Sequence, residues 1–223
     1  MISQVFTDRI GGVSKGPYES LNLAFHVSDE IDSVKENREL IAKRSAPTVY
    51  MNQSHGNQVA IVDGIPLLEP NVDGLITTQK GIALAVLVAD CIPLLMWDEQ
   101  EPCVAAVHVG RKGLMSNIAS KVVNLMWQMG ARDIHAQMGP SICGKCYEVG
   151  EDVYREVTAL YPSSASQSDK FAFALDLPQA LHMHLTSLGV KVTRSEICSY
   201  ESSEHFSYRR AGTTGRNAGM IWI

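Results

Sequence analysis

The chain has 223 residues, of which 45% are hydrophobic and 19% are charged, and its formal net charge is -5. These proportions are typical of a folded globular protein with a sizeable core, and the acidic balance argues against a nucleic-acid-binding surface. The longest apolar run, Gly81 to Ala89, is far shorter than the roughly 20 residues that span a bilayer, so we expect no membrane association.

The cysteine content and the N-terminal residues bear on the compartment. Five cysteines are an odd number, and the first residues lack the apolar core of a signal peptide. Reduced thiols in the cytoplasm are therefore expected, and free thiols can bind metal there.

The first eighty residues predict one helix and several short strands. A strand near Phe6 leads into a glycine-rich turn, and apolar residues at helical spacing predict a helix over 28–45, which Pro47 ends. Short strands are predicted over 48–51 and 59–62, on either side of the polar segment 53–58, and another is predicted over 73–77.

The segment from Gly81 to Gly113 contains two runs that are apolar enough to be buried strands. The first run ends at Asp90-Cys91 and the second at His108. Gly110 and Gly113 follow at a strand-to-helix turn, where the backbone must come close to another group. A thiol and an imidazole at the ends of adjacent buried strands predict a functional site.

The remaining residues alternate between helical and strand patterns. Three helices are predicted. The first has Leu114, Ile118, Val122, Leu125 and Met129 on its apolar face, the second covers 148–160, and the third begins after Asp176 as its N-cap and has leucines on its apolar face. Strands are predicted over 134–138, 190–192 and 220–223, and 163–169 is expected to be a surface loop. With no repeat and no linker, this alternation favours a single mixed α/β domain over residues 1–223.

His55, Cys91 and His108 each lie beside a predicted strand end. Two imidazoles and one thiolate are good ligands for zinc or copper, and three protein ligands leave open the position that a catalytic metal needs. The residues alone also allow a catalytic pair in which Cys91 attacks and a histidine acts as base. A buried thiol beside two hydrogen-bonded core histidines is the third interpretation.

The other cysteines give weaker signals. Cys143-Gly-Lys-Cys146 is a C-x-x-C segment, but a zinc half-site needs two more ligands and no second C-x-x-C is present. We therefore expect a loop with two free thiols. Cys103 and Cys198 are expected to serve packing.

Several arginines and one lysine could hold an anion. Arg209, Arg210 and Arg216 are set among glycines and threonines, whose turn amides bind phosphate together with guanidinium groups. Arg111 and Lys112 directly follow the predicted site at the start of a helix. Arg38 lies on the apolar face of the first helix, where its head either reaches water or points inward at an anion.

A set of short motifs along nearly the whole chain resembles the polyphenol oxidase, or laccase-domain, family. Members of this family are also described as purine nucleoside phosphorylases and, in some bacteria, as peptidoglycan-editing enzymes. The most specific motifs are those that contain the cysteine and the histidines: Gln53-Ser-His55-Gly, Ala89-Asp-Cys91-Ile-Pro and Ala105-Ala-Val-His108. Weaker ones include Phe6-Thr-Asp-Arg-Ile-Gly-Gly, Glu36-Asn-Arg38, Asp73-Gly-Leu-Ile-Thr, Tyr147-Glu-Val-Gly150 and Phe206-Ser-Tyr-Arg-Arg.

The resemblance implies a fold, a metal and an activity. It implies a single compact domain of stacked mixed sheets flanked by helices, with zinc or copper held by His55, Cys91 and His108. It implies phosphorolysis of adenosine, inosine or methylthioadenosine, with adenosine deamination as a side activity. Arg38, Arg111, Lys112, Arg209 and Arg210 would then hold phosphate. Amide hydrolysis of a muramyl-amino-acid precursor, copper-dependent phenol oxidation and a non-catalytic metal-binding role stay open.

One segment departs from the family pattern. The family usually has His-Ala-Gly-Trp-Arg-Gly where this chain has His108-Val-Gly-Arg111-Lys112-Gly113. The aromatic ring is lost, and a lysine keeps the charge of the arginine but not its bidentate fork. Metal binding should survive this change, whereas the substrate contacts of this loop should be weaker.

Overall fold

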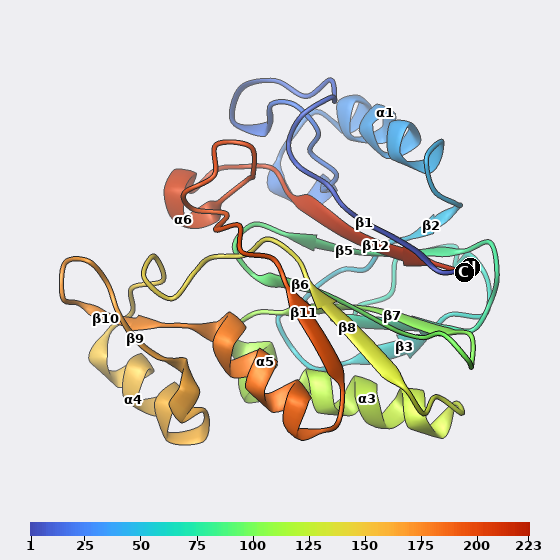
Figure 1. The fold of residues 1–223 in the computed structure, drawn as a ribbon. Helices are drawn as coiled ribbons and strands as arrows, with labels where there is room; N and C mark the ends of the chain where they lie inside the picture. Colours follow the sequence, from blue (N-terminus) through green and yellow to red (C-terminus); the bar gives the residue numbers. More distant parts are fainter.

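Two mixed β-sheets packed face to face form the centre of the molecule, as the computed structural model of residues 1–223 shows (Figure 1). The smaller sheet has four strands in the order β1-β12-β5-β2, and the larger has six in the order β11-β8-β6-β7-β4-β3. The strands are β1 (Ser3–Phe6), β2 (Thr48–Val49), β3 (Val59–Ile61), β4 (Gly74–Thr77), β5 (Ala83–Val88), β6 (Ile92–Asp98), β7 (Cys103–Val109), β8 (Ile134–Met138), β11 (Lys191–Arg194) and β12 (Asn217–Trp222).

Helices cover the outer face of each sheet. One helix, α1, covers the smaller sheet, whereas α3 and α5 lie under the larger one (Figure 1). The helices are α1 (Ile31–Ala42), α2 (Arg111–Met115), α3 (Ile118–Gln128), α4 (Glu151–Leu160), α5 (Leu177–Ser187) and α6 (Tyr208–Ala211). The predicted α/β class of stacked mixed sheets flanked by helices is confirmed.

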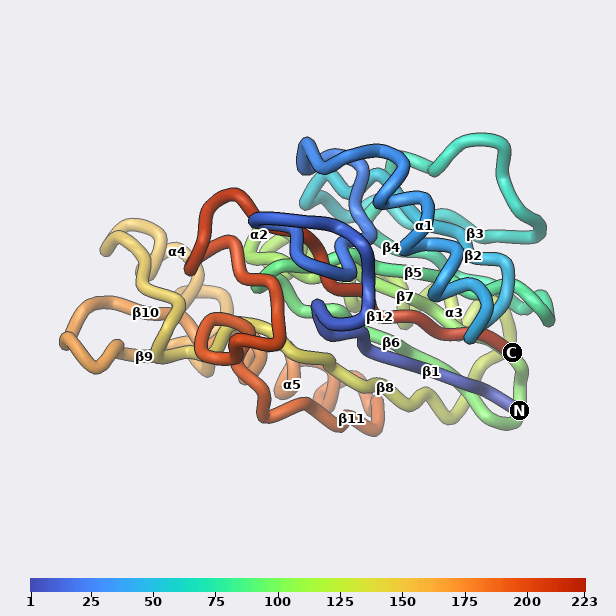
Figure 2. The backbone as a smooth tube through the Cα atoms, turned by 90° about the horizontal axis from the view of Figure 1, so that it is seen from above, coloured from blue at the N-terminus to red at the C-terminus, as the bar shows by residue number.

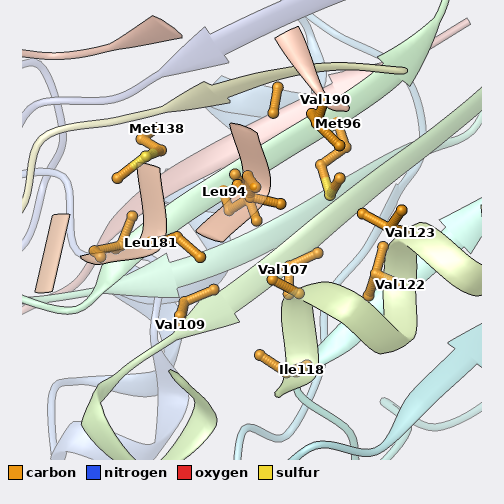
Figure 3. Packing of buried hydrophobic residues seen from close by; sticks show 14 of the residues in the cluster. Leu94, Met96, Val107, Val109, Ile118, Val122, Val123, Met138, Leu181 and Val190 are labelled. Carbon is orange, nitrogen blue, oxygen red and sulfur yellow. The ribbon is translucent and has the colours of Figure 1, made fainter. Parts of the chain in front are cut away.

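Strand alternation divides the core into three layers. Ala83, Ala85 and Leu87 of β5 face α1, whereas Leu84 and Val86 face the larger sheet. In the larger sheet, the residues of β6 and β7 that point away from the smaller sheet meet the helices. Figure 3 shows this layer, where Leu94, Met96, Val107 and Val109 pack against Ile118, Val122 and Leu181. Both sides of these strands are therefore buried, which explains why their sequences are almost continuously apolar.

The two chain ends lie side by side, as the view from above shows (Figure 2). The N-terminal strand β1 pairs antiparallel with the C-terminal strand β12, and β12 also pairs with β5 in the middle of the sheet. The last residues of the chain are thus needed to complete the smaller sheet. No helix combines the length and the apolar character that a membrane span requires.

Most of the predicted elements are present, with three corrections. The helix predicted after His108 is two helices, α2 and α3, because Asn117 adopts a left-handed conformation with φ 57° between them. In α3 the buried face carries Val123 and Met126, whereas Leu125 and Met129 are only partly buried. The segment predicted as a surface loop forms a 3-10 turn (Pro162–Ser164) and a short hairpin of β9 (Ala165–Gln167) and β10 (Phe173–Leu175).

Candidate metal and substrate site

The carboxylate of Asp73 is buried directly before β4 and organises the site. It accepts hydrogen bonds from the backbone N–H groups of Ser54, His55 and Gly56 at 3.2, 2.9 and 2.8 Å and from the Ser54 hydroxyl at 2.9 Å. The loop between β2 and β3 therefore wraps around this anion. His55 is held in a left-handed conformation with φ 61°, which is uncommon outside glycine and often marks functional sites.

His108 is held by the same carboxylate. Its ring Nδ1 lies 2.8 Å from Asp73 Oδ1, and its backbone N–H donates to the Asp73 carbonyl, also at 2.8 Å. Strand alternation places His108 on the same side of β7 as Val104 and Ala106, which face the smaller sheet. With Nδ1 bonded to a carboxylate, Nε2 is left to face a metal or a substrate, an arrangement common around metal-binding histidines.

Cys91 lies at the point where the chain crosses from one sheet to the other. The prediction that β5 and β7 are adjacent strands is wrong, because β5 belongs to the smaller sheet and β7 to the larger. The thiol meets His108 for a different reason: Cys91 directly precedes β6, and β6 begins beside the end of its antiparallel partner β7, with Ile92 opposite Val109. The cluster thus lies at one end of the space between the sheets.

Asp90 fixes this crossing from the other side. Its φ is 88°, and its two carboxylate oxygens accept hydrogen bonds from the Ser199 hydroxyl and the Arg209 backbone N–H, each at 2.7 Å. A strained backbone of this kind persists only where surrounding contacts hold it. The C-terminal segment therefore positions Cys91 through its neighbour.

The three candidate ligands converge on one point of the structure. One ligand atom each from His55, Cys91 and His108 lie within 4.8 Å of one another, and the two imidazole rings are edge to face, with centroids 4.6 Å apart. Donors around a tetrahedral zinc stand roughly 3.3 to 3.6 Å apart. A Cβ on Gly110 would lie 2.9 Å from Cys91 Sγ and 3.4 Å from His55 Cδ2, so only glycine leaves this space free.

The two histidines stabilise the thiolate form of Cys91. Burial alone would raise the pKa of Cys91, but His108 and His55 lower it to about 6. Burial alone would lower the pKa of His108, but Cys91 and the hydrogen bond to Asp73 raise it to about 9. Burial likewise opposes ionisation of Asp73, yet the bonds from His108, Gly56 and Ser54 hold its pKa well below the usual range. At neutral pH Cys91 is therefore a thiolate, the form that binds metal or attacks a substrate.

The cluster opens into a pocket of about 660 Å³. Cationic side chains and aromatic or apolar side chains share its wall. The cationic residues are Arg111, Lys112, Arg209 and Arg216, and the aromatic and apolar ones include Leu87, Val88, Ile142, Tyr147 and Tyr208. The structure thus brings together three of the five predicted phosphate ligands.

Arg38 and Arg210 lie elsewhere, with their guanidinium groups engaged by the protein. Arg38 pairs with Glu69, donates to the Leu23 carbonyl at 2.8 Å and lies over the rings of Phe25 and Tyr50. Arg210 donates to four backbone carbonyls, those of Ser199, Tyr200, Ser202 and His205. The structure does not bring either side chain to the pocket.

The sequence predictions did not include the residues that position the cluster or several that line the pocket. No functional role was predicted for Asp73, Asp90, Tyr147, Tyr208 or His26. Only the placement of Asp73 between a polar turn and a buried strand hinted at a buried carboxylate.

Comparisons with known proteins agree along the full length of the chain. A family model described as multi-copper polyphenol oxidoreductase laccase matches residues 3–223. A protein of Streptomyces coelicolor named purine nucleoside phosphorylase is 44% identical, over 98% of this chain and 94% of its own length. A protein of the same name from Escherichia coli is 36% identical, over 96% and 91%.

Solved structures share the fold. The crystal structure of a hypothetical protein from Bacillus licheniformis has a TM-score of 0.92 at 28% identity, covering 100% of this chain and 92% of that one. A crystal structure from Geobacillus stearothermophilus has a TM-score of 0.90 at 30% identity, covering 99% and 91%.

The role of Asp73 can be tested with the isosteric change Asp73→Asn. The amide removes the charge and cannot accept from all of the present donors, so zinc affinity should fall about 10- to 100-fold. Breaking this buried network should also lower the free energy of unfolding by about 3 to 5 kcal/mol. Competition with a chromophoric chelator and urea denaturation measure the two effects. Asp63→Asn, at an exposed residue, is the control, and wild-type zinc affinity in Asp73→Asn would contradict the role.

The open space beside the cluster can be tested with Gly110→Ala. The added methyl group would press on the Cys91 sulfur, so the three ligands could no longer close around one ion and zinc content should fall. Elemental analysis of the purified protein measures this. Gly64→Ala is a matched control, since nothing lies within 4 Å of a Cβ there. Equal zinc content in the two variants would show that the space is not needed.

Proposed function

This chain belongs to the multi-copper polyphenol oxidoreductase laccase family, and from that membership we propose that it is a metal-dependent purine nucleoside phosphorylase. Adenosine and inosine are the proposed substrates, with methylthioadenosine as a further one. The observation that carries the proposal is the joining of two features in one pocket. A two-histidine, one-cysteine cluster that suits zinc lies beside four cationic side chains that suit phosphate.

Phosphate recognition is assigned to the cationic part of the wall. The Lys112 side chain makes no hydrogen bond or ion pair with the protein, so its ammonium is available to a ligand. Arg111 has only a 3.8 Å approach to the exposed Glu156, and Arg209 keeps one Nη1 bond to the Glu148 carbonyl. Guanidinium and ammonium groups together offer the donors that a phosphate dianion requires.

The base and the ribose are assigned to the rest of the wall. Tyr147 and Tyr208 offer aromatic rings to a purine, and Leu87, Val88 and Ile142 offer apolar surface. Arg209 lies over the Tyr147 ring at 5.0 Å and helps to fix that ring in place. These contacts supply part of what the missing tryptophan of the Arg111-Lys112 loop would have supplied.

The reaction joins these parts. A phosphate oxygen forms a bond to ribose C1′ while the bond from C1′ to the purine nitrogen breaks, and the released base gains a proton. His55, Cys91 and His108 would hold the metal, which when bound supplies Lewis acidity toward a substrate oxygen or a water. Asp73 keeps His108 in one tautomer throughout, and the cationic side chains hold phosphate beside the sugar.

The same geometry favours a second candidate, a hydrolase that uses Cys91 as nucleophile. Cys91, His108 and Asp73 follow the order of nucleophile, base and orienting carboxylate that is found in cysteine hydrolases. The proposed substrate class is an amide such as that of a muramyl-amino-acid precursor. Copper-dependent phenol oxidation has less support, because this cluster is a single mononuclear site and reduction of dioxygen to water takes four electrons.

A nucleoside panel with and without phosphate separates these activities. A phosphorylase releases base from adenosine or inosine only when phosphate is present and yields ribose 1-phosphate, whereas a cysteine hydrolase acts on its amide without phosphate. Conversion of adenosine to inosine in the same assay would report deamination. Absence of phosphate-dependent base release by zinc-loaded protein would refute the proposed function.

The phosphate site predicts the effect of Lys112→Ala. A charge-assisted hydrogen bond contributes about 1.5 to 3 kcal/mol, so the KM for phosphate should rise roughly 10- to 100-fold. The KM for nucleoside should change much less, because the lysine contacts only one substrate. Lys80→Ala is the control, since Lys80 is exposed in the turn before β5, at the end of that strand remote from Cys91. Equal changes in both constants would contradict the assignment.

A further inference from the structure

A second cluster of metal-binding side chains lies outside the pocket. It consists of Cys143, Cys146, Cys198 and Glu201, whose ligand atoms all lie within 4.8 Å of one another. All three cysteines are free thiols, and none of these four residues lines the pocket described above. This cluster takes no part in the proposed phosphorylase reaction.

The sequence spacing in the cluster is that of a two-part metal site. Cys143 and Cys146 are three residues apart, and so are Cys198 and Glu201. Each pair lies in a tight turn: the N–H of Cys146 donates to the Cys143 carbonyl at 3.1 Å, and the N–H of Ser202 donates to the Cys198 carbonyl at 2.9 Å. Such turns point two side chains at one centre, as in zinc sites built from two short loops.

The fold holds the two turns against each other. Ser141 and Cys198 form a parallel bridge, in which the Ser199 N–H donates to the Ser141 carbonyl at 3.0 Å. The N–H of Cys143 points at the Cys198 sulfur at 3.4 Å. Gly144 is packed so closely that a Cβ there would lie 2.6 Å from Asp176 Cβ, which keeps the first turn in place. The convergence of the four ligands is therefore part of the fold.

We propose that Cys143, Cys146, Cys198 and Glu201 bind a second metal ion of the zinc class. Three sulfurs and one carboxylate oxygen fill the four positions of a tetrahedral zinc, whose donors stand roughly 3.8 Å apart when sulfur lies at about 2.3 Å. Zinc accepts a carboxylate as the fourth ligand beside three thiolates. With four protein ligands, the ion has no open position for a substrate. The site is structural. Binding replaces three thiol protons with the metal, and no electrons are transferred.

The site has a defined consequence for the pocket. The first turn lies between Ile142 and Tyr147, both of which line the pocket. The second turn contains Ser199, the residue whose hydroxyl donates to Asp90 beside Cys91. A metal joining the two turns would hold this wall of the pocket and the strained Asp90 together. The inference does not depend on the reaction that the pocket performs.

Zinc binding by the full chain tests the proposal. Reduced, metal-free protein should take up two zinc ions per chain, and His55→Ala should take up one. Cys146→Ser and Cys198→Ser should also take up one. Cys103→Ala removes a buried cysteine outside the cluster and is the matched control, with two ions expected. In the His55→Ala background, cobalt should still give the intense thiolate-to-cobalt absorption of a site with several sulfurs.

Glu201→Gln keeps the test independent of folding. Glu201 is exposed, so the variant should fold as the wild type does, and its Kd for the second zinc should rise at least about tenfold. Two zinc ions bound with unchanged affinity in Cys146→Ser, Cys198→Ser and Glu201→Gln would overturn the proposal. Uptake of a single ion by wild type that disappears in His55→Ala would overturn it too. Freshly purified protein could instead contain a disulfide between two of the three cysteines. If such protein took up no second zinc ion after the disulfide was reduced, the proposal would also be overturned.

Discussion

The buried carboxylate of Asp73 is the constraint on which the site depends. A buried anion is costly unless donors surround it, and here three backbone N–H groups, one hydroxyl and one imidazole do so. The same bonds that stabilise the charge shape the loop that presents His55 and fix the tautomer of His108. The ligand geometry and the satisfaction of Asp73 are therefore one network, so neither can change alone.

The second constraint is the crossing of the chain between two packed sheets. β5 and β6 are consecutive strands in different sheets, so the residues that link them must turn sharply at the end of the core. Asp90 adopts the strained, positive-φ conformation that this turn requires. The Ser199 hydroxyl and the Arg209 N–H, both in the C-terminal segment, stabilise it by donating to its carboxylate. Cys91 is thereby exposed to the pocket although both neighbouring strands are buried. The reactive thiol is a product of the topology.

Much of the fold could be predicted from the sequence, because buried strands and capped helices leave local patterns. The apolar runs on either side of Cys91, the Asp176 cap and the strand at 134–138 are examples. The helix break at Asn117 could not be predicted, since the apolar spacing continues across it. The assignment of β5 to the other sheet was missed for a related reason: two strands buried on both sides look alike in sequence wherever they pair.

The site shows the same division. His55, Cys91 and His108 stood out because their side chains are reactive, whereas Asp73 acts through contacts that only the fold creates. Arg38 and Arg210 were expected at the anion site because guanidinium groups bind anions, but protein carboxylate and carbonyl oxygens occupy their donors. Glu201 was missed because a carboxylate three residues after a cysteine resembles any surface residue until the C-x-x-C turn is seen beside it.

Metal binding at the Asp73-supported cluster is tested most directly by a zinc-edge anomalous diffraction map of crystals of the zinc-loaded protein. We expect a peak within coordination distance of His55, Cys91 and His108, with His108 Nδ1 still bonded to Asp73. A zinc-loaded crystal with no peak among these three residues, or with the His108 ring turned away from Asp73, would contradict it.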